Sequence, residues 1–373
     1  MIACEELDQF HPAKHLVQTL DLSESVRMKL VSFFSGSGGL DLGFEKAGFD
    51  IIWANEYDKS IWETYERNHP NTRLDRRSIV DVPSDEVPDC EGIIGGPPCQ
   101  SWSAAGALRG IEDKRGQLFY DFIRIIQAKR PKFFLAENVA GMMAPRHAEA
   151  LKNIQAMFRD CGYRLSFELL NASDYGVPQD RKRVFFIGIR DDFDFSFEFP
   201  EPFKDKVCLE DAIGDLRESA IPALDKNTTN GEGCEVPNHE FLTGGFSTIY
   251  MSRNRVRSWE EQSFTIQAGG RHCPIHPSAP KMVKVGLDKQ IFEPGCESQY
   301  RRMSVREAAR IQTYPDDFVF HYRALLDGYK MVGNSVPVQL GKVLAEAIQR
   351  QFKAHKAQGK ASKAAVAMVP EVH

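Results

Sequence analysis

The stretch GGPPCQSWS, residues 95–103, places a cysteine directly behind two prolines. Each proline fixes its own φ and restricts the residue before it, so the pair stiffens the chain that leads into Cys99. A free thiol has a pKa of about 8.5 and is only partly ionised at neutral pH, yet its thiolate is a strong nucleophile that suits covalent catalysis. The alternative role for Cys99 is that of a small buried hydrophobe, and the proline frame favours the catalytic role.

A second candidate is the glycine-rich stretch FSGSGGLD, residues 34–41, which exposes backbone N–H groups to a ligand. Counted from Gly36, the dinucleotide pattern G-x-G-x-x-G ends on Asp41, whose carboxylate opposes a pyrophosphate. Glu56 follows Gly39 by 17 residues, close to the distance at which an acid holds ribose hydroxyls. The pattern therefore favours a nucleoside such as S-adenosylmethionine. The alternative is a simple tight turn, with Glu56 at a solvated strand end.

These candidates need strands to position them, and the sequence contains four suitable apolar runs. They cover residues 30–34, 50–56, 92–96 and 132–139. Each run ends in, or is directly followed by, polar or glycine residues, which is typical of buried parallel strands with chemistry at their carboxyl ends. Helical periodicity follows at 116–130 and 147–162. The alternation predicts an α/β fold with a doubly wound, mostly parallel, Rossmann-like sheet.

The chain divides into stretches of different composition. Beyond about Asp191 the alternation stops and Pro, Gly, Asn and Thr become frequent, which predicts an irregular second domain. Helical periodicity returns at 338–352, and an Ala- and Lys-rich tail follows. We expect an N-terminal extension at 1–27, a catalytic and cofactor-binding domain at 28–195, a smaller domain at 196–324, a segment at 325–352 that returns to the first domain, and a flexible tail at 353–373.

The overall composition is that of a soluble globular protein, with 42% hydrophobic and 27% charged residues. No apolar run approaches the roughly 20 residues of a membrane span, and the first residues lack the apolar stretch of a signal peptide. We therefore expect a cytoplasmic protein. The net charge of −5 is uneven, because residues 251–310 hold eleven Lys and Arg against six acids. Such a basic segment suits contacts to phosphates.

The eight cysteines are spread irregularly and form no C-x-x-C pair, which argues against a zinc ribbon and a disulfide framework. His272, Cys273 and His276 could supply three metal ligands, but no fourth is nearby and prolines interrupt the cluster. We expect no metal site.

Five motifs together resemble those of the DNA cytosine-5 methyltransferases, in the order that this family keeps. GGPPCQSWS is similar to the nucleophile motif and FSGSGG to the cofactor loop. ENV (137–139), QDRKR (179–183) and VGNSVP (332–337) are similar to the proton-handling, arginine and closing motifs. The resemblance covers residues 28 to about 352. It implies that the second domain is a target-recognition domain.

The resemblance also implies roles for individual residues. Cys99 is the implied nucleophile, which adds to cytosine C6, and Glu137 would protonate N3 as charge develops. Arg183, by analogy, reaches O2 of the base. Strand-like alternation would place Gln179, Arg181 and Arg183 on one face, with Arg181 also in the catalytic set. The neutral alternative for Glu137 and these arginines is a buried ion pair.

The methyl donor implied is S-adenosylmethionine. Its implied binding residues are Phe34, Ser35, Gly36, Gly38, Gly39, Leu40, Glu56, Tyr57, Ile79, Pro97, Asn334 and Val336. One departure concerns the family's usual Gly-Asp-Ile, whose Asp contacts the adenine amino group. Arg77, Ser78 and Ile79 stand there, and Asp81 is one possible substitute.

The implied substrate is duplex DNA, whose target base must be flipped out of the helix. We expect the glycine-containing segment 101–117 to close over that base; the alternative is an ordinary surface loop. The block from Tyr250 to Cys273 resembles the HaeIII-type methyltransferases, which modify the inner cytosine of GGCC. The implied DNA contacts are Ser101, Ile249, Arg253, Arg255 and Arg271. A solvated basic face is the alternative for any one arginine, and we expect it for Arg257.

The sequence therefore predicts the methyltransferase of a restriction–modification system. We expect a monomer; a cognate restriction endonuclease, where there is one, would be a functional partner and not a bound subunit. The alternative inside the fold is an RNA cytosine-5 methyltransferase, which the long basic second domain disfavours. A nucleotide-dependent oxidoreductase is opposed by Asp41, and a non-catalytic DNA-binding module by the presence of Cys99 and Glu137.

Overall fold

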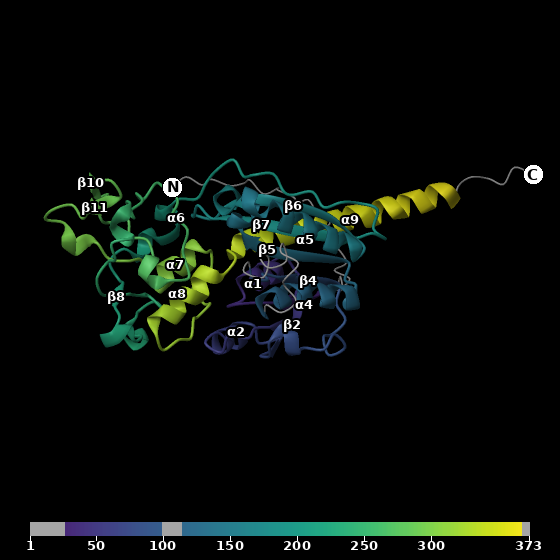
Figure 1. Cartoon of the computed structure of the whole chain (residues 1–373), viewed down its shortest axis with the longest axis horizontal. Helices are drawn as coiled ribbons and strands as arrows, with labels where there is room; N and C mark the ends of the chain where they lie inside the picture. The colour runs from purple at the N-terminus through teal and green to yellow at the C-terminus, as the bar shows by residue number, and fades with distance from the viewer. Residues whose placement is uncertain (1–26, 99–113, 368–373) are drawn as a thin grey trace, which may run out of the picture.

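The computed structural model describes residues 27–98 and 114–367. Cys99, Ser101 and most of the predicted closing segment lie outside the described residues. The chain forms two parts that lie side by side in Figure 1, one built on a large sheet and one with little regular structure.

The first part is built on a seven-stranded sheet. Its strands are β1 (Lys29–Phe33), β2 (Asp50–Asn55), β3 (Arg73–Asp75), β4 (Gly92–Gly95), β5 (Phe133–Val139), β6 (Tyr163–Asn171) and β7 (Lys182–Arg190), in the order β3-β2-β1-β4-β5-β7-β6. Five neighbouring strands pair in parallel, and β7 pairs antiparallel with both β5 and β6. This confirms the predicted mostly parallel α/β sheet.

Helices cover both faces of the sheet, and the side chains of β5 show why. Phe133 and Leu135 point into a core shared with α1 (Gly39–Lys46) and α9 (Val338–Ala367). Phe134 and Ala136 point into the opposite core, shared with α4 (Lys114–Lys129) and α5 (Ala148–Asp160). Burial of each large apolar side chain contributes about 1.5–3 kcal/mol. Because both faces are covered, the first four residues of the strand, 133–136, are all apolar and do not alternate with polar ones.

The second part is irregular. It contains the helices α6 (Leu209–Ile213), α7 (Val305–Ile311) and α8 (Leu325–Asn334), and the short strands β8 (Ile221–Pro222), β9 (Glu240–Phe241), β10 (Val283–Gly286) and β11 (Lys289–Ile291). Helix α2 (Trp62–Asn68) of the first part lies near it in Figure 1. Helix α8 packs with α7 and also contacts the first part through Lys330 and Asp58, and α9 packs against α1 on the sheet. Helix α9 continues through 353–367, where the sequence predicts a tail, and its end projects from the body of the molecule.

None of the helices within 27–98 and 114–367 combines the length and apolarity that crossing a bilayer requires. The same residues contain no cluster of three His, Cys, Asp or Glu side chains arranged to hold a metal ion. Cys273 and His276 are buried in the second part, whereas His272 is exposed.

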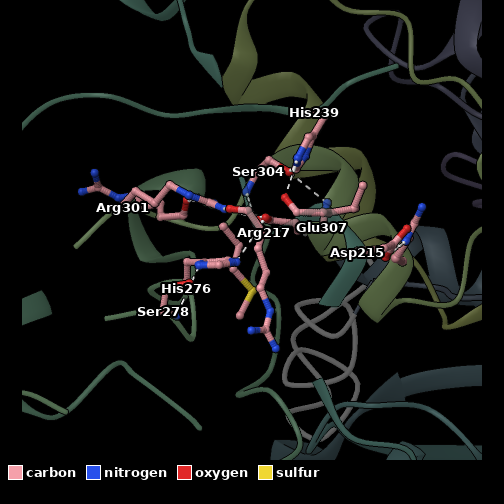
Figure 2. Close-up of polar contacts among 12 residues, drawn as sticks. Asp215, Arg217, His239, His276, Ser278, Arg301, Ser304 and Glu307 are labelled. Atoms are coloured by element: carbon pink, nitrogen blue, oxygen red, sulfur yellow. Dashed lines mark hydrogen bonds and ion pairs between the residues drawn. The ribbon is translucent and has the colours of Figure 1, made fainter. Parts of the chain in front are cut away.

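His276 belongs to a buried polar cluster formed largely by residues of the basic segment 251–310 (Figure 2). Its Nε2 lies 3.4 Å from Oε1 of Glu307, and both side chains are almost fully buried. Arg301 donates to both oxygens of Glu307, at 2.7 and 2.8 Å. Burial alone would raise the pKa of Glu307, but these bonds lower it, so the carboxylate stays ionised. Burial lowers the pKa of His276 to about 4.

The His276 site predicts acid sensitivity. Because the folded pKa lies below the usual 6.5, the unfolded chain binds more protons between these values, and stability falls as the pH drops from about 6.5 towards 4. The loss attributable to His276 reaches roughly 3 kcal/mol at pH 4. Urea unfolding at pH 7 and pH 5 measures it. His276→Gln should show a smaller pH dependence than the unsubstituted protein, and equal slopes would contradict this assignment.

Candidate functional site

A cavity of about 370 Å³ opens at the carboxyl ends of β1, β4 and β5. The strand order reverses between β1 and β4, which is where open α/β sheets bind ligands. Eight predicted cofactor residues line it: Phe34, Ser35, Gly36, Leu40, Glu56, Pro97, Asn334 and Val336. Glu137 lines the same cavity, so the structure brings the glycine loop and the proton-handling motif together.

Glu56 presents a fixed carboxylate to the cavity. One oxygen accepts the backbone N–H of Gly36 at 2.9 Å, and the other accepts that of Asp58 at 2.7 Å. Burial raises the pKa of Glu56, while these two backbone bonds counteract the shift. The acid at the end of β2 is therefore rigid and tied directly to the glycine loop. A solvated strand end would show neither feature.

Gly38 and Gly39 act through close packing and do not line the cavity. A Cβ on Gly38, whose φ is +85°, would lie 2.1 Å from His69 Nε2. A Cβ on Gly39 would lie 2.0 Å from Ser335 Oγ and 2.5 Å from the hydroxyl of Tyr314. Real Cβ atoms do not approach that closely, so the loop needs glycine at both positions for its neighbours to reach it.

Two other predicted cofactor residues lie away from the lining. Tyr57 is 72% exposed, and Ile79 is buried in the core on the face of the sheet that α4 and α5 cover. Ser78 and the exposed Asp81 do not line the cavity either, whereas Asp58 does. Among the described residues, Asp58 is thus an acid near the ligand position that the sequence reasoning missed.

Asp41 also lines the cavity, and the sequence did not reveal that its carboxyl group is a buried acceptor of two hydrogen bonds. Its carboxyl group is fully buried and accepts hydrogen bonds from Ser32 Oγ at 2.7 Å and from the Tyr65 hydroxyl at 2.6 Å. Burial raises the pKa of Asp41 to about 6, against the lowering effect of His69 and these two bonds. The only signal in the sequence was that an acid stands at the last position of the dinucleotide pattern. The hydrogen-bond partner of Asp41, Tyr65, lies 24 residues further along the chain, so no local pattern marked it.

Glu137 and Arg183 form an ion pair at the mouth of the cavity. The Nε of Arg183 lies 2.9 Å from Oε1 of Glu137, and each side chain keeps about one-seventh of its surface exposed. They come from the paired strands β5 and β7. Next to Glu137, Asn138 donates from Nδ2 to the carbonyl of Pro97 at 2.9 Å. The chain entering Cys99 is therefore anchored beside the ion pair.

Arg181 lies elsewhere, and the prediction that three alternating residues share one strand face is wrong. Strand β7 begins at Lys182, so Gln179 and Arg181 precede it and are fully buried. The guanidinium of Arg181 donates to the carbonyls of Ile266, Gly333 and Ser335 at 2.8–2.9 Å. Burial lowers the pKa of Arg181 to about 9, which leaves it charged at neutral pH. Its contacts tie the two parts together, and Arg181 lies behind the cavity wall, because its partner Ser335 lines the cavity and Arg181 does not.

The predicted DNA contacts separate into exposed and buried residues. Ile249 is 71% exposed, and Arg253 and Arg271 are also exposed. Arg255 is buried, donates to the carbonyls of Tyr250 and Ile249 at 2.9 and 3.2 Å, and lies over the ring of Tyr250. Arg255 therefore shapes the segment that presents Ile249.

Arg257 is not on a solvated face, contrary to our expectation. It pairs with Glu261 at 2.9 Å and with Asp180 at 3.3 Å. Asp180 also lines a cleft of about 200 Å³ together with Arg253 and Thr265. This cleft runs between the arginine motif and the basic segment.

Comparison with known proteins agrees with this geometry. Residues 28–350 match the family model of the C-5 cytosine-specific DNA methylases. The chain is 58% identical over 325 residues to the type II methyltransferase M.FnuDI of Fusobacterium nucleatum, covering 86% of this chain and 94% of that protein. It is 56% identical to M.MthTI of Methanothermobacter thermautotrophicus, covering 88% and 99%. The solved structure of the Entamoeba histolytica methyltransferase EhMeth superposes with a TM-score of 0.63 at 17% identity, covering 87% and 99%, and supports the fold.

Proposed function

Because the chain belongs to the C-5 cytosine-specific DNA methylases and is a DNA (cytosine-5-)-methyltransferase that uses S-adenosylmethionine, we propose that it methylates the inner cytosine of GGCC as the modification enzyme of a restriction–modification system. Its relatives in Fusobacterium and Methanothermobacter are type II methyltransferases, which supports the second half of the proposal. The likeness of residues 250–273 to the HaeIII-type enzymes supports the first half.

The cavity fits this methyl donor. Among the described residues, it is lined by Asp41, Glu56, Asp58 and Glu137 and by no Lys or Arg. An acidic lining suits a cationic sulfonium and opposes a pyrophosphate, which prefers basic groups and free N–H donors. Glu56 is placed to accept from ribose hydroxyls, and Gly36 and Pro97 allow close approach of the ligand to the backbone. When bound, the donor supplies an electrophilic methyl group.

Cys99, together with the ion pair at the cavity mouth, supplies the rest of the chemistry. The thiolate of Cys99 adds to C6 of the cytosine, and the electron pair of the C5–C6 bond makes C5 nucleophilic. Glu137 donates a proton towards N3 as negative charge develops there, and Arg183 stabilises O2. After C5 is methylated, loss of the C5 proton restores the double bond and expels the sulfur. The observation that carries this proposal is the convergence of Pro97, Glu137 and Arg183 beside one acidic cavity.

The second part supplies the DNA contacts. A cytosine inside a duplex cannot reach a cavity at strand ends, so it must be flipped out. Arg253 and Arg271 are exposed, and Ile249 offers an exposed apolar side chain in the same part of the molecule. Arginine reads guanine O6 and N7 in the major groove. We propose that Arg253 reads a guanine directly, and that Arg255 acts by holding the segment that carries Ile249.

Arg253→Ala should weaken discrimination at one guanine position by about 1–3 kcal/mol, because a bidentate contact is lost. Competition binding with duplexes substituted at each guanine of the site measures the change. Arg255→Ala should instead weaken binding to all duplexes, since its side chain is buried. Arg159→Ala, an exposed arginine on α5, is the control. An unchanged preference in Arg253→Ala would remove this residue as a reader.

Plasmid protection tests the proposed function. Plasmid with several GGCC sites, isolated from cells that express the protein, should resist a nuclease that methylation at GGCC blocks. Plasmid from cells expressing Cys99→Ser should be cut. Cleavage at every site in the first sample would exclude GGCC as the target.

A further inference from the structure

We propose that Tyr314 is a positioning residue for the methyl donor, because its hydroxyl joins two walls of the cavity that are far apart in the sequence. One wall is the glycine loop, through Ser37, and the other is the turn 334–336, through Ser335. The inference rests on the assignment of this cavity to S-adenosylmethionine. We call Ser37, Tyr314 and Ser335 the hydroxyl clasp.

The clasp is short and buried. The Tyr314 hydroxyl lies 2.9 Å from Ser37 Oγ and 2.6 Å from Ser335 Oγ, and Ser335 Oγ lies 3.0 Å from the carbonyl of Val336. All three side chains are less than one-tenth exposed. Ser37 Oγ also lies 3.3 Å from the carbonyl of Met331, so a backbone carbonyl stands at each end of the clasp. A hydroxyl donates one hydrogen bond and accepts up to two, so the three protons serve the two contacts of Tyr314 and one of these carbonyls. Burial raises the pKa of Tyr314 to about 12, so its proton remains available.

The backbone around the clasp is shaped to let it form. Gly39 stands at the first turn of α1, where a Cβ would collide with both Ser335 Oγ and the Tyr314 hydroxyl. The absence of a side chain there lets the two hydroxyls meet under the glycine loop. The cofactor loop thus depends on a tyrosine that lies 277 residues from Ser37 along the chain.

The segment that carries Tyr314 is held in a strained conformation. Thr313 has a φ of +62°, which is unfavourable for a β-branched residue and persists only where its surroundings fix it. Gln312 donates to the carbonyls of Val332 and Ser335, and Thr313 Oγ1 accepts the N–H of Gln339. Residues 312–314, which directly follow α7, therefore all bind the stretch 332–339, and this stretch contains the far wall of the cavity. Strain held at this point indicates a requirement for exact placement of the wall.

Loss of the clasp should weaken binding of the donor more than it slows chemistry. Phenylalanine keeps the ring and its packing but removes the hydroxyl, so the two walls lose the link through Tyr314. The donor must then order the walls as it binds, and that cost lowers affinity. Two lost hydrogen bonds correspond to a rise of about tenfold in the Kd. The turnover number should change by about twofold or less, because Tyr314 does not reach Glu137 or Arg183.

Calorimetric titration of the full chain with S-adenosylmethionine tests the inference, together with kcat and KM for the same compound. Tyr314→Phe should raise Kd and KM about tenfold. Ser37→Ala removes the other end of the clasp without touching the ring, and should do the same. The double variant should lose less than the sum of the two single losses, because both single variants break the same Ser37–Tyr314 contact. Tyr163→Phe is the matched control, since its buried hydroxyl donates to the carbonyl of Pro131 on the far side of the sheet.

The outcomes separate cleanly. If the unsubstituted protein does not bind S-adenosylmethionine, the donor assignment fails, and this inference fails with it. If it binds and Tyr314→Phe and Ser37→Ala bind as tightly, only the inference fails. Equal losses in Tyr163→Phe and Tyr314→Phe would show general destabilisation and would also overturn it. A tenfold loss confined to the clasp variants supports it.

Discussion

Replacing Cys99 with serine should abolish methyl transfer, by about three orders of magnitude or more, while binding of duplex DNA is retained. A serine hydroxyl is far less ionised than a thiol at neutral pH and has no base positioned for it in the proposed mechanism. The substitution changes one atom, so the surface offered to DNA stays the same. Transfer of labelled methyl groups and a gel-shift assay measure the two properties separately.

Cys90→Ser is the matched control for this experiment. Cys90 lies before β4, at the opposite end of the strand from the Pro97–Pro98 pair. Burial raises the pKa of its thiol to about 12, so it remains protonated and unreactive. This variant should keep its activity within a few-fold. Full activity of Cys99→Ser would refute the nucleophile assignment.

Replacing Glu137 with glutamine should lower kcat by about 10²- to 10⁴-fold, the usual contribution of general acid catalysis. Glutamine keeps the size of the side chain and can still accept from Arg183, but it cannot transfer a proton to N3. Single-turnover rates with excess S-adenosylmethionine measure the chemical step. Glu168→Gln, on the exposed side of β6, controls for removal of one charge. A rate within tenfold of the unsubstituted protein would leave Glu137 as a structural ion-pair partner only.

The sequence predicted the sheet well because its signals are local. The four apolar runs correspond to β1, β2, β4 and β5, with ends that differ by at most one residue. Parallel strands bring their carboxyl ends to one edge, so Glu56, Pro97 and Glu137 had to lie close together once the strands were assigned. Their place at that edge followed from the positions of the apolar runs along the chain and from their parallel pairing.

Side-chain direction outside regular elements was not predictable. The arginine motif alternates in sequence, but β7 begins only at Lys182, so Gln179 and Arg181 turn into the core and Arg183 towards the cavity. Tyr314 was missed for a related reason. Its partner Ser37 lies in another motif, and no local pattern marks a hydroxyl that is used 277 residues away.

Charge counting also overestimated the surface available to DNA. Several arginines of the basic segment form hydrogen bonds or ion pairs within the second part: Arg255, Arg257, Arg301, Arg302, Arg306 and Arg310. Arg253 and Arg271 remain exposed. The net charge of a segment gives the excess of basic over acidic residues. It does not show which basic side chains are already bound to carbonyls or acids in the folded protein. A smaller set of cations is therefore available to phosphates and bases.

The most direct test of the mechanism is a trapping experiment with duplex DNA that carries 5-fluorocytosine at the inner cytosine of GGCC. Fluorine replaces the C5 proton, so after methylation the base cannot restore its double bond and the sulfur cannot leave. With S-adenosylmethionine present, mass spectrometry should find the DNA attached to the peptide that contains Cys99, and Cys99→Ser should give no adduct. If a protein that methylates the ordinary duplex forms no adduct, covalent attack by Cys99 is contradicted.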